Sequence, residues 1–159
     1  MKTVYFILLL CITSHFAACR PDKDLAEEAP MVENSSDTFN TDSMKLKITI
    51  GQKVLIATMY NNPTTRDFTS LLPLTLTLTD YNGTEKISDL PKKLSAKGAP
   101  AGYKPSAGDI TIYAPWGNLA VFYKDFSYSS GLIVLGKINS GIDALKVPGS
   151  VKVKMELIQ

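Results

Sequence analysis

Histidine and cysteine are nearly absent from this chain of 159 residues, which has one histidine and two cysteines. Cys11, His15 and Cys19 all lie within the first 19 residues, and neither type occurs afterwards. The rest of the chain therefore cannot build a Ser-His-Asp or Cys-His nucleophilic site, a zinc site of Cys and His, or a disulfide. Neither a P-loop nor a dinucleotide-binding fingerprint occurs. We expect no catalytic residue of these classes, no metal and no cofactor.

The first 18 residues follow the pattern of a secretory signal peptide. Lys2 supplies a positive charge, an apolar run extends from Val4 to Ile12, and two alanines precede Cys19. The run is too short to cross a bilayer as a stop-transfer helix. We predict that residues 1–18 are removed on export.

The segment Phe16-Ala17-Ala18-Cys19 resembles the lipobox of bacterial lipoproteins, with phenylalanine where leucine is usual. The resemblance implies cleavage before Cys19 and lipidation of that cysteine. Each buried acyl methylene contributes about 0.8 kcal/mol, so several chains would anchor the protein to membrane lipid. The implied location is the bacterial cell envelope, at the outer membrane or the periplasmic face. The alternative is an ordinary signal peptide followed by a chance cysteine.

Charge divides the remaining chain near residue 43. Residues 19–43 carry seven Asp and Glu against two Lys and Arg, and we predict that they form a disordered acidic tether. Residues 44–159 carry 14 Lys and Arg against eight Asp and Glu, a net charge of +6, and form the predicted domain. Thirteen of these 14 cations are scattered lysines, which we interpret as solvated strand faces. No nucleic acid partner is expected.

Alternation of apolar and polar side chains dominates residues 44–159. Leu46 and Ile48 alternate with lysine and threonine, and Gly51-Gln52 provides a hairpin turn into a second strand, Lys53 to Met59. The nearly unbroken apolar run from Gly131 to Ile138 is typical of a strand covered on both faces. Further strands are predicted at residues 74–78, 85–88, 110–113, 119–124 and 151–157, which makes about eight. In the last of them, the residues expected to face inward are Val151, Val153, Met155 and Leu157.

Helices are few. Asn62 is a suitable N-cap with Pro63 at the first helical position, and this short helix must end before Pro73. A helical turn is predicted at residues 141–145 and a long loop at residues 89–105. Many short strands with little helix favour a mainly β fold, a closed or nearly closed barrel.

Several segments, in this order along residues 44–159, resemble small bacterial cyclophilin-like domains. Besides the opening hairpin, they are Tyr60 to Arg66, Leu72 to Leu76, Tyr103 to Ile110, Leu119 to Phe126 and Leu135 to Ile138. The resemblance implies an eight-stranded barrel capped by short helices, which is shared with the cyclophilin peptidyl-prolyl isomerases. It does not carry their activity over, because this chain has no counterpart of their Phe-His-Arg segment or Gln-Gly-Gly run.

Arg66 is the single arginine of the predicted domain and the first residue of a candidate ligand groove. Prolyl isomerisation needs an apolar pocket and a guanidinium that donates to the prolyl nitrogen. The alternative is that Arg66 pairs with Asp67 on the surface, while Phe122 and its neighbours belong to the core. The groove is predicted to comprise Tyr60, Arg66, Tyr113, Trp116, Phe122 and Tyr123.

The leading hypothesis is an envelope lipoprotein whose barrel binds a peptide, a protein partner or a small ligand without catalysis. The alternative is a divergent prolyl isomerase or folding helper for exported proteins, and a third possibility is a structural part of a surface assembly. A deep groove that contains both Arg66 and a proline-sized apolar pocket would favour the isomerase. Asp109 is expected to close a turn through an Asx-type hydrogen bond.

Overall fold

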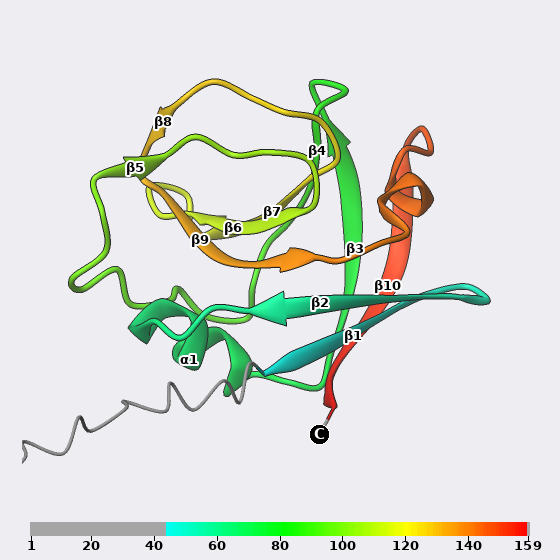
Figure 1. Ribbon diagram of the computed structural model, residues 1–159, viewed down its shortest axis with the longest axis horizontal. Coiled ribbons are helices and arrows are strands. Elements are labelled where there is room, and N and C mark those ends of the chain that lie inside the picture. Colours follow the sequence, from blue (N-terminus) through cyan, green and yellow to red (C-terminus); the bar gives the residue numbers. More distant parts are fainter. Residues whose placement is uncertain (1–43, 159) are drawn as a thin grey trace, which may run out of the picture. The chain divides into compact units, whose positions relative to one another are not determined.

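The computed structural model describes residues 44–158 (Figure 1). The predicted signal peptide, Cys19 and the tether at residues 19–43 lie outside them. Eight antiparallel strands close into a barrel in the order β1-β10-β3-β4-β7-β6-β9-β2, which confirms the predicted mainly β fold class. Their bounds are β1 Lys45–Ile50, β2 Lys53–Met59, β3 Leu74–Tyr81, β4 Glu85–Ser88, β6 Asp109–Tyr113, β7 Asn118–Phe122, β9 Leu132–Ile138 and β10 Ser150–Ile158.

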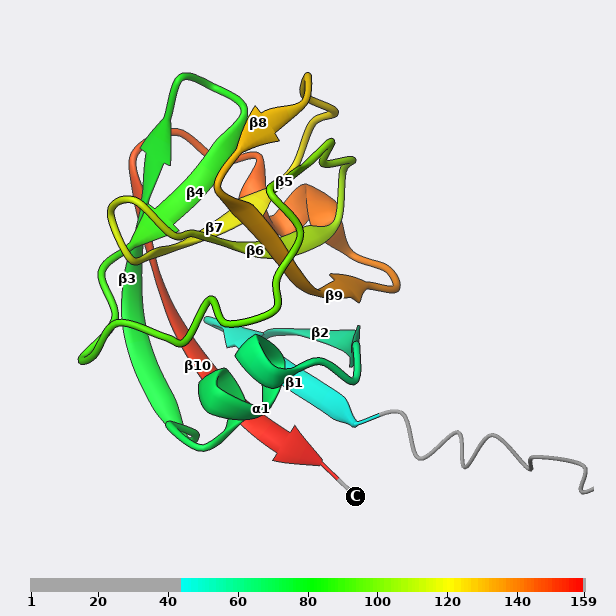
Figure 2. The ribbon, with the colours of Figure 1, turned by 90° about the vertical axis from the view of Figure 1, so that its left-hand side faces the viewer.

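Four further elements complete the domain. The helix α1 is Pro63–Thr69, and the 3-10 turn η1 is Ile142–Leu145. The strands β5 (Gly102–Tyr103) and β8 (Ser129–Ser130) pair in a separate small sheet beside the barrel (Figure 2). The sequence did not predict β5 and β8, because a strand of two residues shows no alternation.

The opening hairpin forms as predicted. Gly51 has a φ of +57°, a left-handed conformation that glycine adopts without the penalty of a Cβ atom. The register places Leu46 opposite Ala57 and Ile48 opposite Leu55. All four side chains are buried inside the barrel.

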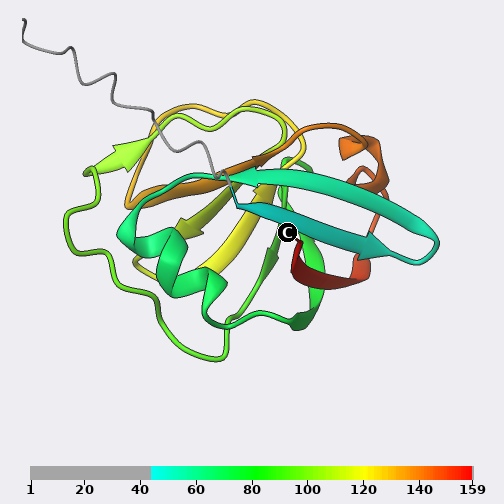
Figure 3. The same cartoon turned by 60° about the horizontal axis from the view of Figure 1, so that its bottom comes forward.

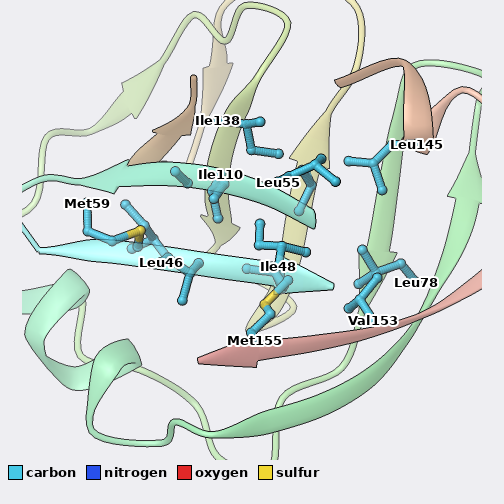
Figure 4. Close-up of a cluster of buried hydrophobic side chains, with 14 of the residues drawn as sticks. Leu46, Ile48, Leu55, Met59, Leu78, Ile110, Ile138, Leu145, Val153 and Met155 are labelled. Carbon is cyan, nitrogen blue, oxygen red and sulfur yellow. The ribbon is translucent and has the colours of Figure 1, made fainter. Parts of the chain in front are cut away.

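Inward apolar side chains from strands far apart in the sequence fill the barrel (Figure 4). Complete burial of each Leu or Ile contributes about 1.5–3 kcal/mol to folding. In β10, Val153 and Met155 are buried as predicted, whereas Leu157 is 45% exposed because it lies near the end of the strand. The core members that Figure 4 labels are Leu46, Ile48, Leu55, Met59, Leu78, Ile110, Ile138, Leu145, Val153 and Met155.

The strand β7 is buried on both faces. Leu119 and Val121 join the core inside the barrel. Ala120 and Phe122 alternate with them and form a second buried cluster with Leu132 of β9. Every residue of β7 is therefore buried, and five of the seven residues of β9 are buried as well. This outer cluster gives the barrel an apolar patch on its outer face.

Asn62 fixes both the start of α1 and its place on the barrel. Its Oδ1 accepts a hydrogen bond from Thr65 N at 2.8 Å, and its Nδ2 donates to Val134 O at 3.0 Å. Thr65 Oγ1 also donates to Leu135 O at 3.0 Å, so two polar contacts hold α1 against β9. The helix lies close to β1 and β2 in Figure 3, and its Phe68 is fully buried in the barrel core.

The barrel closes where β2 meets β9, along only three residue pairs. One of these pairs joins Met59 to Gly136. A Cβ atom on Gly136 would lie 2.5 Å from Thr58 O and 2.9 Å from Met59 Cα, inside van der Waals contact. Because these atoms belong to the backbone, β2 approaches this closely only if residue 136 is glycine.

Lys86 crosses the barrel interior as a buried cation with no exposed surface. Its Nζ donates to Val147 O at 2.5 Å and to Gly149 O at 2.7 Å, and lies 3.0 Å from Asp80 Oδ1. Asp80 Oδ1 also accepts a hydrogen bond from Tyr123 Oη at 2.6 Å. The network joins the loop before β10 to β3 and β4.

Substituting Lys86 with methionine is expected to lower the free energy of unfolding by about 3 kcal/mol, because two carbonyls and a carboxylate lose their buried donor. Urea unfolding followed by circular dichroism measures the loss. Lys152→Met, on the exposed side of β10, is the matched control and is expected to change stability by less than about 0.5 kcal/mol. Equal losses in the two variants would contradict the structural role of Lys86.

Candidate functional site

A pocket of about 270 Å³ lies on the outer face of the barrel. The register of β4 and β7 builds its floor by placing Glu85 beside Phe122 and Ile87 beside Ala120. Lys86 points inward, so its two neighbours in β4 point outward. The remaining lining residues are Tyr81, Asn82, Thr84, Tyr113, Trp116, Asn118, Phe126, Ser129 and Leu132.

Aromatic rings line much of this pocket. Trp116, in the turn between β6 and β7, packs edge-to-face against Tyr81 with ring centroids 6.1 Å apart and planes at 88°. It packs against Tyr113 in the same way, at 5.4 Å and 83°. Phe126 lies near Phe122, with centroids 6.2 Å apart. Trp116 remains 59% exposed and is the only tryptophan of the chain, so its fluorescence reports directly on this pocket.

Glu85 is the acidic side chain of the pocket lining. Desolvation by burial raises the pKa of Glu85 from its ordinary value of 4.5 to about 7. Within residues 44–158, no lysine or arginine lies within ion-pair distance of its carboxylate. A half-buried carboxyl group without a counter-charge is more often found at functional sites than elsewhere on a protein.

Asn118 adds a second polar group to the lining. Its side chain is buried, and its Nδ2 donates to Leu119 O at 3.3 Å. Its Oδ1 is also buried and has no hydrogen-bond donor among the described residues. Leaving such an acceptor unpaired costs about 1–3 kcal/mol, which a donor from a bound molecule could recover.

Three of the six residues predicted for the ligand groove meet in this pocket. Tyr113, Trp116 and Phe122 line it together. Phe122 lines the pocket and also belongs to the buried outer cluster. It is therefore both a pocket residue and, as the alternative interpretation held, a core residue. Tyr60, Arg66 and Tyr123 do not line the pocket.

Arg66 lies in α1, and Tyr60 directly follows the end of β2. The helix α1 lies away from the β3–β4 hairpin (Figures 1 and 2). The guanidinium of Arg66 is exposed, and its Nη1 donates to Asn61 Oδ1 at 2.6 Å. Asp67, the partner suggested by the sequence, pairs instead with Lys92 at 2.6 Å.

Tyr123 faces the other side of β7, in the barrel interior. Its hydroxyl bonds to Asp80, and the Nζ of Lys86 lies 5.9 Å from its ring centroid. Burial and the neighbouring carboxylate of Asp80 raise the pKa of Tyr123 to about 12. Tyr123 therefore belongs to the Lys86 network and not to the pocket.

Sequence reasoning missed Tyr81, Glu85 and Asn118 as pocket residues. The sequence does contain a signal for Glu85. Glu85 and Ile87 lie two residues apart and therefore share one face of a strand. A charged residue beside an apolar one on the outward face indicates that this face is partly covered. Tyr81 and Phe126 approach the pocket only through the curvature of the barrel and the path of the β7–β8 loop.

Asp109 closes a turn, as expected, but its bonds come from Ser106, three residues before it, and not from a later backbone N–H as in an Asx turn. Its Oδ2 accepts hydrogen bonds from Ser106 N at 2.7 Å and from Ser106 Oγ and Tyr103 Oη at 3.1 Å. Its Oδ1 lies 3.2 Å from Lys137 Nζ. These contacts hold the segment between β5 and β6 against the barrel.

No group of three or more His, Cys, Asp and Glu side chains in residues 44–158 could hold a metal ion. Over the same range, no helix has the length and apolar character needed to cross a membrane.

The fold and the pocket define a closed antiparallel barrel with an aromatic pocket on its outer face. The profile of the Cyclophilin-like family matches residues 48–156, so the chain belongs to this family. The solution structure of the hypothetical protein AF2241 from Archaeoglobus fulgidus is similar, with 18% identity and a TM-score of 0.52. That likeness covers 72% of this chain and 94% of AF2241, and it supports the fold alone. No curated protein matches the sequence significantly.

Glu85 is expected to make stability depend on pH. The unfolded chain ionises Glu85 near its ordinary pKa of 4.5, whereas the folded chain keeps the proton until about pH 7. Between these values the folded state holds more protons, so the free energy of unfolding falls as pH rises and levels off above pH 7. After allowance for solvent screening, the contribution of Glu85 is expected to be on the order of 1 kcal/mol.

Urea unfolding of the native chain and of Glu85→Gln at pH 5 and pH 8 measures this contribution. The substitution is expected to reduce the decline in stability between the two pH values. Glu156→Gln is the control, because Lys154 and Lys47 hold the pKa of Glu156 below its ordinary value. An unchanged decline in Glu85→Gln would show that this carboxyl group is not desolvated.

Proposed function

We propose that the protein is a membrane-anchored envelope lipoprotein whose cyclophilin-like barrel binds a ligand in the pocket between Tyr81, Trp116 and Phe122. The protein acts by binding, without prolyl isomerisation. Cys19 carries the lipid anchor, and residues 19–43 link it to the barrel.

The chemistry of the pocket lining carries the binding proposal. Its floor and walls are apolar and aromatic, as in most small-molecule sites, with Glu85 and Asn118 as polar groups that could orient a ligand. Stabilising an isomerising prolyl bond needs a donor near the prolyl nitrogen. This pocket contains a carboxyl group where that chemistry needs a cation, and Arg66 lies outside it. These two facts favour binding over isomerisation.

The anchoring proposal rests on the sequence before the barrel. The apolar run from Val4 to Ile12 and the segment from Phe16 to Cys19 match a lipoprotein signal. Because the acidic residues 19–43 separate that cysteine from the barrel, the binding domain would work at some distance from the membrane surface.

An isomerase assay on the full chain tests the catalytic alternative. With a proline-containing peptide, we expect no acceleration above the uncatalysed rate, at a concentration where an active cyclophilin is readily measured. The Arg66→Ala variant is assayed beside the native chain and is expected to behave identically. Catalysis by the native chain that collapses in Arg66→Ala would overturn the proposal and place Arg66 in an active site.

Metabolic labelling with a fatty acid in a bacterial host tests the anchor. The native chain and Cys11→Ala are expected to incorporate the label and to sediment with membranes. Cys19→Ala is expected to lose both properties, because it removes the sulfur that accepts the lipid. Incorporation that persists in Cys19→Ala would refute lipidation at this residue.

A further inference from the structure

The arrangement of three aromatic rings in the pocket, those of Tyr81, Tyr113 and Trp116, indicates the chemistry of its ligand. Trp116 stands nearly perpendicular to both Tyr81 and Tyr113, so the three rings form adjoining walls instead of one flat stack. The face of an aromatic ring carries negative charge and attracts cations, most strongly for tryptophan. Adjoining aromatic walls are the usual way in which proteins hold alkylated ammonium groups.

The charges around the pocket favour the same kind of ligand. Glu85 lies in the lining without a cationic partner among the described residues, although residues 44–159 carry 13 lysines. Among the described residues, the cation–π contacts involve Tyr123, on the opposite face of β7, and none of the rings of Tyr81, Tyr113 and Trp116. The charge that would complement Glu85 is therefore not supplied by the described chain.

We infer that the pocket binds a small organic cation with a methylated ammonium group, and this inference rests on the ligand-binding function proposed above. The ammonium lies against Tyr81, Tyr113 and Trp116, and Glu85 supplies the opposite charge. Methylation suits this site because the apolar side chains of Ile87 and Phe122 have no hydrogen-bond acceptors. They could not replace the water that solvates the N–H groups of a bare ammonium ion.

The size of the pocket favours a free small molecule over a larger ligand. Its volume of about 270 Å³ lies just below the range for small-molecule sites, about 300–1,000 Å³. Asn118 Oδ1, buried without a donor, could accept a hydrogen bond from a hydroxyl group on the ligand. Since this oxygen is covered in the unliganded chain, the amide would have to turn toward the cavity to accept it.

Choline and its uncharged carbon isostere, 3,3-dimethylbutan-1-ol, separate charge from shape. Each is titrated against the full chain at pH 8, above the pKa of Glu85, with Trp116 fluorescence as the signal. Choline is expected to bind at least about tenfold more tightly than the isostere, because only choline gains the cation–π and carboxylate interactions. Calorimetry gives a second measure that does not depend on tryptophan.

Two matched pairs of variants test the residues assigned. Glu85→Gln is expected to weaken choline binding about tenfold and to leave isostere binding unchanged, whereas Glu156→Gln on β10 changes neither. Tyr81→Ala is expected to weaken choline binding by a similar factor, and Tyr60→Ala, outside the pocket, is its control. Circular dichroism confirms that each variant is folded. Choline binding that is insensitive to both Glu85→Gln and Tyr81→Ala would overturn the assignment.

The pattern of binding separates failure of this inference from failure of the proposed function. Equal binding of choline and the isostere would overturn the cation inference and leave a pocket for apolar ligands. Binding of neither probe would overturn the inference together with the pocket as a small-ligand site.

A choline group could also come from a lipid headgroup. Sedimentation with phosphatidylcholine vesicles, in the Cys19→Ala background without the predicted anchor, distinguishes this source. We expect free choline to bind without retention on vesicles, and retention on vesicles without binding of free choline would overturn the assignment to a free ligand.

Discussion

Closure of the barrel along β9 is the constraint on which the other features depend. This strand pairs with β6 on one edge and with β2 on the other, and the β2 seam consists of three residue pairs. The seam exists because Gly136 has no Cβ atom, so the backbone of Met59 can occupy the space that a side chain at residue 136 would fill. The same strand accepts hydrogen bonds from α1 through Val134 O and Leu135 O. A single glycine therefore permits the approach that joins the two ends of the sheet.

The pocket is a consequence of burying two faces of one sheet. Inside the barrel, Leu119 and Val121 complete the core; outside, Ala120 and Phe122 need a cover of their own. The loops that carry β5 and β8 cover part of the outer cluster, and the uncovered part becomes the pocket floor. Glu85 sits at this border, where desolvation favours its neutral form. Architecture thus places an ionisable group in apolar surroundings.

Alternation in the sequence predicted most of the barrel, because each strand buries one face and the pattern is local. The opening hairpin, the capped helix at Asn62 and the doubly covered run at Gly131 to Ile138 all followed from neighbouring residues. The site was predicted only in part. Tyr113, Trp116 and Phe122 meet as expected, whereas Arg66 does not line the pocket. Proximity of that kind depends on strand order and register, which no local pattern encodes.

The register of β10 gives the domain two distinct poles. Ile158 pairs with Lys45 at one end of the strand, and Ser150 pairs with Thr79, beside the β3–β4 hairpin, at the other. The strand has nine residues, so eight steps of about 3.3 Å separate these ends by ~26 Å. The described part of the chain therefore begins and ends at one pole of the barrel, while the pocket opens near the other. Most of the length of β10 thus separates the two ends of the described chain from the pocket.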